Sequence, residues 1–370
     1  MSDPANLATT SILRVSCGKI PIDKVLILAL LCTTVLADDR ESALREAVWG
    51  GRWLEGVRLY DELERAGAVP SPQASYLAGL ALWRLRRPED ARAPLVKAAT
   101  AGFRAGGGRP QPDELLAKVD AYLLRRPAPI DVPGLDGSVI AACSDTPLGS
   151  PVLVGLPRFP EIGRRIFGDL PPIRFFFFAH LPRFERFYES LYDSRAKPMG
   201  TPHSTAGVGM VLFCEEKARR GTTAETVSMA LHETMHAWVA TYLRSRYDRP
   251  ISLPAYVDEG LATYVASLWS EEVAALPAQR VAQWRRRGQA APTFEALRRN
   301  DTFYEADRTS SNYFLSEQLI ERLIGPPDQG ATRIRAFLDA CAEHGDDLRA
   351  WRQVSGRDAA AEYAALAAGK

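Results

Sequence analysis

The chain has 370 residues, of which 46% are hydrophobic and 25% are charged, an ordinary composition for a folded protein. Its length allows roughly two domains at about 150 residues each. The 46 basic and 45 acidic residues leave a formal net charge of +1, so no broad field attracts nucleic acid or an acidic membrane surface. Short basic runs such as Arg285–Arg287 are interpreted as solvated helix faces, and we expect no nucleic-acid partner.

The N-terminus has the pattern of a secretory signal. The uncharged apolar run Val25–Val35 follows three basic residues and precedes Ala37 and two aspartates. Because a membrane-spanning helix needs about 20 apolar residues, this run is too short for a stable span. We predict a signal at residues 1–37, cleaved after Ala37, and a secreted or periplasmic protein. A buried helix of a cytosolic protein and an uncleaved anchor are the alternative interpretations.

Three of the five cysteines lie beyond this segment, namely Cys143, Cys214 and Cys341. They permit at most one disulfide, and no CxxC spacing indicates a cysteine-based zinc site. Cysteines this far apart are more typical of plain buried residues than of a disulfide framework.

Residues 38–125 are rich in alanine, leucine and arginine and have a helical pattern with weak self-similarity. Small or apolar residues recur 35 residues apart, first as Ala47, Gly56, Tyr60 and Leu63 and then as Leu82, Ala91, Leu95 and Ala98. A period near 34 with small residues between paired helices resembles the tetratricopeptide repeat. We predict an all-α, repeat-like region that is a candidate surface for a protein partner. An unrelated helical hairpin packed on the main domain is the alternative.

A proline- and glycine-rich stretch at residues 126–137 is predicted to be a linker, and the main domain then spans residues 138–370. The first part of this domain contains three short apolar runs typical of strands, Ser138–Cys143, Ile173–Ala179 and Gly207–Phe213. Four consecutive phenylalanines in the second run indicate a strand covered on both faces. The glycines of the third run indicate an edge strand or the close approach of another chain.

After Gly221 the pattern is helical almost to the C-terminus. Thr222 and Glu225 form a capping box before a helix over about 224–243. Pro254 is expected in the first turn of a second helix that ends near residue 269. Further helices are predicted near residues 271–287, 309–324, 330–343 and 357–367. Strands followed by helices predict an α+β domain with a small mixed sheet and a helical C-terminal part.

The segment Leu231–His236 carries the residues with the clearest chemistry. His232 and His236 are four residues apart on the predicted helix, so both imidazoles lie on one face and can reach one ion. Glu233 lies beside that ion, where its carboxylate can take a proton from a water molecule. Apolar residues flank the motif, and ionisable groups in such a helix need a partner, which a metal supplies. The alternative is a helix with two histidines that bind no metal.

A catalytic zinc site needs a third protein ligand and one open position. Glu259, in the segment Pro254–Ala262, lies 23 residues after His236, and turn-prone residues before it allow the second helix to pack beside the first. Together the two motifs resemble the gluzincin metallopeptidases, in which a glutamate on a following helix completes the HExxH site. The similarity is greatest to the peptidase-MA-like group, whose second motif reads Pro-x-aromatic-apolar-x-Glu-Gly-apolar-Ala. It covers about residues 138–360.

The resemblance implies a zincin-like fold and one Zn²⁺ ion bound by His232, His236 and Glu259. It also implies Glu233 as general base, which takes a proton from water and later delivers it to the leaving amine. Zinc would lower the pKa of the bound water toward 7 and polarise the scissile carbonyl group. The implied partner is a peptide or protein substrate.

The chain departs from the family pattern at position 263. Some gluzincins place an aspartate four residues after the ligand glutamate, where it orients a histidine, but this chain has Thr263. The threonine hydroxyl can serve instead, as a weaker support of the metal ligands. Asp258 is the alternative orienting carboxylate, although we expect it to point away from the helix face that carries Glu259.

The tetrahedral intermediate of peptide hydrolysis needs a hydrogen-bond donor for its oxyanion. In related families a downstream tyrosine often supplies it, and the resemblance implies Tyr313, near the start of a predicted helix. Tyr304 and His203 are alternative donors, and a Tyr313 that only packs its ring in the core is the other interpretation. We expect His180 and His344 at the surface.

These features predict a zinc metallopeptidase that hydrolyses peptide bonds through a metal-activated water. In related enzymes an edge strand before the metal helix, here within Ser204–Phe213, pairs with the substrate backbone. The alternative function is a non-catalytic scaffold, a repeat-like module fused to a degenerate metal-binding peptidase domain. Glu233 argues against it, because a structural zinc site needs no general base and usually has four ligands. Hydrolysis of a non-protein amide is a further alternative.

Overall fold

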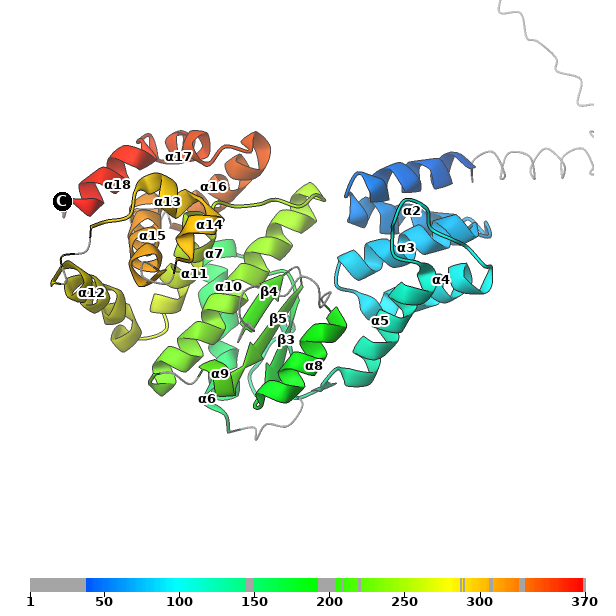
Figure 1. Ribbon diagram of the computed structural model, residues 1–370, viewed down its shortest axis with the longest axis horizontal. Coiled ribbons are helices and arrows are strands. Elements are labelled where there is room, and N and C mark those ends of the chain that lie inside the picture. Colours follow the sequence, from blue (N-terminus) through cyan, green and yellow to red (C-terminus); the bar gives the residue numbers. More distant parts are fainter. Residues whose placement is uncertain are drawn as a thin grey trace, which may run out of the picture.

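The structure is a computed structural model that describes residues 38–143, 149–191, 204–207, 209–218, 221–286, 288, 290–305, 309–325 and 330–368. The predicted signal at residues 1–37 and the candidate donor His203 lie outside the described residues. Figure 1 shows a small sheet surrounded by helices, with a separate group of helices at its N-terminal side. Among the helices of these described ranges, none is long and apolar enough to cross a membrane.

The N-terminal region is all-helical, as predicted. A helix over residues 38–49 is followed by α2 (Trp53–Arg65), α3 (Pro72–Arg84), α4 (Pro88–Thr100) and α5 (Pro112–Arg125). A proline opens each of α3, α4 and α5, at the helix position where its missing N–H costs nothing. A Cβ atom on Gly79 would lie 2.5 Å from Leu95, so the small residue permits the close contact of α3 with α4. All eight positions of the proposed repeat are buried, whereas the repeat itself stays a prediction.

The sheet has five strands in the order β1-β2-β3-β5-β4. They are β1 (Ala128–Pro129), β2 (Val139–Cys143), β3 (Ile173–Phe178), β4 (Ser204–Gly207) and β5 (Met210–Cys214). The strands β2, β3 and β5 are parallel, and the two outer strands pair antiparallel with their neighbours. The sheet is therefore mixed, as predicted, and the segment predicted to be a linker contributes its first edge strand.

Two of the three predicted strands are confirmed, as β2 and β3, and the third is confirmed only for its second half, which belongs to β5. The chain does not run straight from Gly207 to Phe213, because it reverses direction at Gly209, whose φ of 73° suits glycine. The reversal produces a hairpin of β4 and β5. A one-dimensional pattern of apolar residues cannot distinguish one long strand from two short ones joined by so tight a turn.

Helices whose bounds the sequence analysis did not predict connect the parallel strands. Between β2 and β3 lie α6 (Pro151–Gly155), a 3₁₀ turn (Leu156–Arg158) and α7 (Phe159–Phe167), and α8 (Leu181–Leu191) lies between β3 and β5. Parallel neighbours require such crossovers. In α7, a Cβ atom on Gly163 would lie 2.6 Å from the Trp238 ring, so α7 packs closely on the helix of the HExxH motif.

The four phenylalanines of β3 divide between two cores. Phe175 and Phe177 belong to the core that contains the C-terminal helices, whereas Phe176 and Phe178 belong to the core of the N-terminal helices and α8. The prediction of a strand covered on both faces is confirmed. The N-terminal helices are thus not joined to the sheet by a linker alone, since they share a hydrophobic core with it.

The C-terminal part is helical, as predicted. It contains α9 (Glu215–Ala218), α10 (Thr223–Tyr247), α11 (Ala255–Ser267), α12 (Glu271–Arg286), α13 (Phe294–Arg298), α14 (Asn300–Phe303), α15 (Thr309–Ile324), α16 (Gly330–His344), α17 (Asp347–Ser355) and α18 (Ala359–Ala367). The short helices α9, α13 and α14 and the helix α17 were not predicted. Pro254 is the N-cap of α11 and not part of its first turn.

Candidate metal centre

The HExxH motif lies near the middle of α10, and the third candidate ligand lies on α11. The predicted capping box is present, because Thr222 accepts a hydrogen bond from the amide of Glu225 and the Glu225 carboxylate accepts one from the amide of Thr222. The helix ends at Asp248, whose left-handed conformation (φ 44°) reverses the chain. In Figure 1, α11 lies beside α10, so the predicted packing of the two helices is confirmed.

Three donor atoms converge between these helices. His232 Nε2 lies 3.1 Å from His236 Nε2 and 3.1 Å from Glu259 Oε2, and His236 Nε2 lies 3.4 Å from the same oxygen. A tetrahedral zinc site with metal–ligand distances of about 2.0–2.2 Å has donor atoms about 3.3–3.6 Å apart. The triangle of donor atoms is close to one face of such a tetrahedron, so this residue set fits a zinc ion.

Asp258 supports the centre from outside. Its Oδ1 atom lies 3.0 Å from His236 Nδ1, which fixes the proton on that nitrogen and leaves Nε2 for a metal. Asp258, which the sequence analysis gave as the alternative orienting carboxylate, therefore does reach a histidine of the site, on the far side of the imidazole ring. Thr263 does not orient a histidine, since its hydroxyl donates to the main-chain carbonyl of Glu259.

The electrostatics of the centre favour a cation. Burial disfavours the charged form of Glu259, but hydrogen bonds with His232 and His236 outweigh burial and hold the pKa of its carboxyl group well below the usual range. Burial also opposes a charge on His236, yet the charge of Asp258 and the hydrogen bond with it outweigh burial and raise the pKa of the imidazole. The carboxylates thus stabilise positive charge where the histidine nitrogens converge.

Two of the three candidate oxyanion donors lie beside the centre. The Tyr313 ring, on α15, has its centroid 5.9 Å from that of His232, and the Tyr304 hydroxyl donates to Glu259 Oε1. Burial, followed by the charge of Glu259, raises the pKa of both tyrosine hydroxyls, and Glu233 contributes to both shifts. Both hydroxyls therefore keep their protons as donors, and Glu233 faces the same space.

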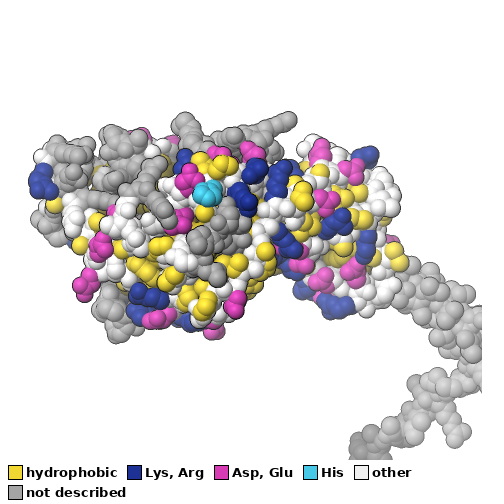
Figure 2. All heavy atoms as spheres, turned by 90° about the horizontal axis from the view of Figure 1, so that it is seen from below, with side chains coloured by type: hydrophobic (Ala, Val, Ile, Leu, Met, Phe, Trp, Pro, Cys, Tyr) yellow, Lys and Arg dark blue, Asp and Glu magenta, His cyan; other side chains and the backbone are white. Residues whose placement is uncertain are grey.

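The remaining histidines and cysteines lie elsewhere. The side chain of His180 is 68% exposed, as predicted, whereas His344 is half-buried and its Nε2 atom lies 2.8 Å from Gln353 Oε1. Cys214 and Cys341 are buried free thiols. On the face drawn in Figure 2, Lys and Arg side chains lie next to Asp and Glu side chains over both the N-terminal helices and the rest of the chain.

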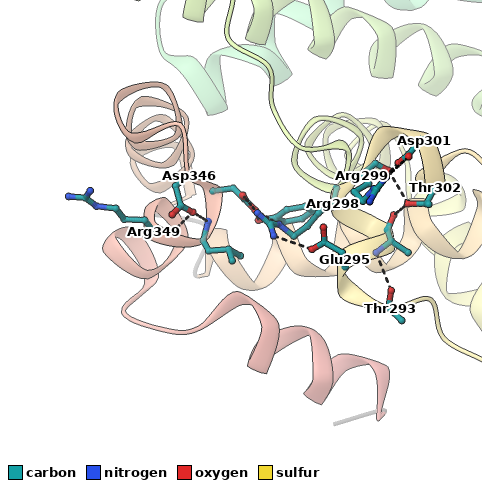
Figure 3. Close-up of polar contacts among 12 residues, drawn as sticks. Thr293, Glu295, Arg298, Arg299, Asp301, Thr302, Asp346 and Arg349 are labelled. Atoms are coloured by element: carbon teal, nitrogen blue, oxygen red, sulfur yellow. Dashed lines mark hydrogen bonds and ion pairs between the residues drawn. The ribbon is translucent and has the colours of Figure 1, made fainter.

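A pocket of about 470 Å³ opens beside the N-terminal end of α11, and no metal ligand lines it. Its charged lining groups have partners: Asp346 accepts the amides of Leu348 and Arg349, and the others form ion pairs. Arg298 binds both carboxylate oxygens of Asp347, and Arg299 binds both oxygens of Asp301 (Figure 3). The first pair joins α13 to α17 and the second lies within the start of α14, so these charged groups have a structural explanation.

No protein-family model and no curated protein matches the chain. Among solved structures, the chain is similar to an M1 zinc metallopeptidase from Deinococcus radiodurans and to a mutant of that enzyme. The identity is 16% for both, and the TM-scores are 0.38 for the first and 0.39 for the mutant. The matches cover 66% of this chain and 51% of the solved chains, so the chain spans about half the length of these enzymes. The function proposed below rests on the site residues and not on this likeness.

Proposed function

We propose that the protein is a zinc-dependent metallopeptidase that binds one Zn²⁺ ion through His232, His236 and Glu259. The observation that carries the proposal is the convergence of the three donor atoms, with separations of 3.1, 3.1 and 3.4 Å. Glu233 directly follows the first ligand in sequence. Its charge, like that of Glu259, raises the pKa of the Tyr304 and Tyr313 hydroxyls. A general base and an incomplete ligand set are typical of a catalytic site.

The chemistry divides among the residues around this centre. When bound, zinc would acidify a water molecule and polarise the scissile carbonyl group. Glu233 takes the proton of the attacking water as its oxygen bonds to the carbonyl carbon. The Tyr313 hydroxyl donates a hydrogen bond to the oxyanion that develops. As the C–N bond breaks, Glu233 returns the proton to the leaving amine.

The strand β4 is the proposed place for the substrate backbone. It forms the outer edge of the sheet among the described strands, and it packs against α10. The turn between β4 and β5 is fixed to α10, because the amide of Gly209 donates to the Thr241 hydroxyl (2.8 Å). An extended peptide that pairs with this edge would lie along the helix that carries His232 and His236.

The alternative function is a non-catalytic scaffold with a degenerate metal site. In such a scaffold Glu233 would take no part in a reaction. Its carboxylate, however, lies beside two histidines and two protonated tyrosines, which are the surroundings typical of a general base. We therefore favour the peptidase. Two measurements on the purified protein decide between them: its zinc content and its cleavage of a mixed peptide library.

We expect one zinc ion per chain and cleavage by the wild type. Glu233→Gln keeps the shape of the side chain but removes the base, so cleavage should fall by a factor on the order of 10² to 10⁴ with zinc retained. Glu259→Ala should lose zinc. Zinc without any cleavage by the wild type would favour the scaffold, and absence of zinc would refute the ligand assignment.

A secreted or periplasmic location and a partner surface on the N-terminal helices also belong to this proposal. The N-terminal sequence of the mature protein tests the first, and we expect it to begin at Asp38. Capture of an interacting protein by residues 38–370 but not by a variant with altered surface residues on α2 to α5 tests the second.

A further inference from the structure

Glu259 uses its two carboxylate oxygens differently. Oε2 lies 3.1 Å from His232 Nε2 and 3.4 Å from His236 Nε2, so it faces the proposed metal position. Oε1 accepts the hydroxyl hydrogen of Tyr304. A carboxylate that bound zinc with both oxygens would occupy the open position that a catalytic site keeps for water. What holds the second oxygen away from the metal therefore matters for the chemistry.

We propose that Tyr304 is a positioning residue that restricts Glu259 to binding through Oε2 alone, and that Asn312 holds Tyr304 in place. The inference rests on the metal centre of the proposed function, but it does not require a peptide substrate. Hydrogen bonds to metal ligands set the orientation and affinity of a site. Here the bond comes from a side chain that lies 45 residues from the ligand in sequence.

Asn312 fixes the main chain directly before Tyr304. It is fully buried on α15, and its Nδ2 atom donates to the carbonyl oxygen of Phe303 (2.6 Å). Within the described residues its Oδ1 atom has no hydrogen-bond partner. Burial of an amide with half its capacity unused costs free energy, so the donor to Phe303 is the contact that explains a polar residue there.

Tyr304 is also held by the ring of Phe303 and by the turn that precedes Phe303. Phe303 is fully buried, and its ring centroid lies 5.1 Å from that of Tyr304 and 5.3 Å from that of Tyr313. The Thr302 hydroxyl donates to the carbonyl of Ala296, which ties α14 to α13 (Figure 3). The approach of Tyr304 to Glu259 is thus set by packed structure, although the residue as a whole is 50% exposed.

The two tyrosines consequently have different parts. The Tyr304 hydroxyl is committed to Glu259 Oε1, and Tyr313, beside His232, is left as the oxyanion donor. Removal of the Tyr304 hydroxyl should weaken metal binding more than removal of the Tyr313 hydroxyl, which also interacts with Glu259 and should chiefly lower turnover.

The test measures zinc affinity of the full chain by competition with a chromophoric chelator, alongside the visible spectrum of the cobalt-substituted protein. We expect Tyr304→Phe to weaken zinc binding about 10- to 100-fold, because the oriented ligand is lost. At saturating cobalt its absorption should also fall, since a freed Glu259 can add its second oxygen to the coordination. Tyr264→Phe is the matched control, because it removes a tyrosine hydroxyl from α11 whose charged neighbours are Glu317 and Glu321 and not the metal ligands, and it should leave both readouts unchanged within about twofold.

The outcomes separate this inference from the proposed function. If Tyr304→Phe keeps the wild-type affinity and cobalt spectrum, the inference is overturned, and a loss of turnover alone would make Tyr304 the oxyanion donor. If affinity and spectrum change but the wild type cleaves no peptide, the positioning part stands and the peptidase proposal fails. Asn312→Ala should weaken zinc binding in the wild type but add little to Tyr304→Phe; additive effects would overturn its assigned part.

Discussion

Asp248, at the end of the metal helix, accepts a hydrogen bond from the main-chain amide of Leu54, 194 residues away in sequence. The distance is 2.8 Å, and the second carboxylate oxygen accepts the amide of Glu55, also at 2.8 Å. Asp248 thereby caps the N-terminus of α2, which has no cap from its own preceding residue. One turn earlier on α10, the buried Arg244 donates to the carbonyl of Gly51 and lies 4.0 Å from the Trp53 ring centroid.

Replacement of Asp248 should therefore weaken the contact between α10 and the N-terminal helices. We expect Asp248→Ala to lower the free energy of unfolding by about 1–2 kcal/mol, the usual cost of a lost N-cap. Hydrogen exchange should rise in α2 and at the C-terminal end of α10. Asp248→Asn keeps one acceptor oxygen and should lose about half as much. Urea unfolding and exchange measurements check this, and a loss below about 0.3 kcal/mol would show that the cap is unimportant.

Local patterns were sufficient to predict the two histidines of the candidate metal site, because their spacing is short, whereas Glu259 followed from the resemblance to gluzincins. His232 and His236 share one face of any helix that contains both, and the capping box at Thr222 predicted that helix. The two-faced burial of β3 likewise followed from its run of phenylalanines. Each of these features is decided within a few residues of sequence.

The parts that the sequence analysis left open or missed depend on contacts between distant segments. Asp258 reaches His236 only because the chain between them places α11 at one particular rotation beside α10. Tyr304 reaches Glu259 through a turn held by Asn312 and by contacts of α13 and α14. No periodicity carries that information. The shared core of the N-terminal helices and the sheet was missed for the same reason.

Gly260 permits the closest contact between the helix of Glu259 and the helix of Tyr313. A Cβ atom there would lie 2.7 Å from the main-chain oxygen of Ser316, and a backbone atom cannot rotate aside. We expect Gly260→Ala to cost about 1–3 kcal/mol of stability by overpacking, despite the better helix propensity of alanine. Zinc affinity should also fall, because α11 must shift.

A glycine with free space provides the control for this prediction. No atom lies within 4 Å of a Cβ built on Gly106, so Gly106→Ala should change stability by less than about 0.5 kcal/mol. Thermal unfolding and chelator competition measure both variants. Equal stabilities of Gly260→Ala and Gly106→Ala would contradict the close contact seen between α11 and α15.

Glu317 on α15 should make stability depend on pH. Burial, in the first place, raises the pKa of this carboxyl group to about 7, and within the described residues its Oε2 atom has no hydrogen-bond partner. The folded state therefore holds a proton that the unfolded state releases near pH 4.5. The stability from this group is complete below that pH and is lost as the pH rises to about 7, by up to about 3 kcal/mol.

Glu317→Gln mimics the protonated form and should remove this dependence. We expect it to match the wild type near pH 4.5 and to exceed its stability by up to about 3 kcal/mol near pH 8. Glu321→Gln, on the same helix but exposed, serves as the control and should keep most of the wild-type slope. Urea unfolding at several pH values measures all three proteins, and a parallel pH profile for Glu317→Gln and the wild type would rule out a buried, protonated Glu317.

Asp258, and not Thr263, supports a ligand histidine, and measurements of zinc affinity can test this. Asp258 Oδ1 lies 3.0 Å from His236 Nδ1, so Asp258→Ala should weaken zinc binding about 10- to 100-fold, as the loss of a carboxylate behind a ligand histidine does. Asp258→Asn keeps an acceptor for the Nδ1 hydrogen but not the charge, and its loss should be smaller. The fold should survive both changes, because 42% of the Asp258 side chain is exposed.

Thr263→Val is the decisive companion variant, because it removes a hydroxyl from the position where some gluzincins carry the orienting aspartate. That hydroxyl donates within its own helix to the carbonyl of Glu259, at 2.7 Å, and not to a histidine. Zinc affinity should therefore stay within about twofold of the wild type, since no metal ligand loses its support. Chelator competition with all four proteins at one pH gives the comparison. A larger loss for Thr263→Val than for Asp258→Ala would restore the family arrangement, with the threonine as the group that supports the ligands.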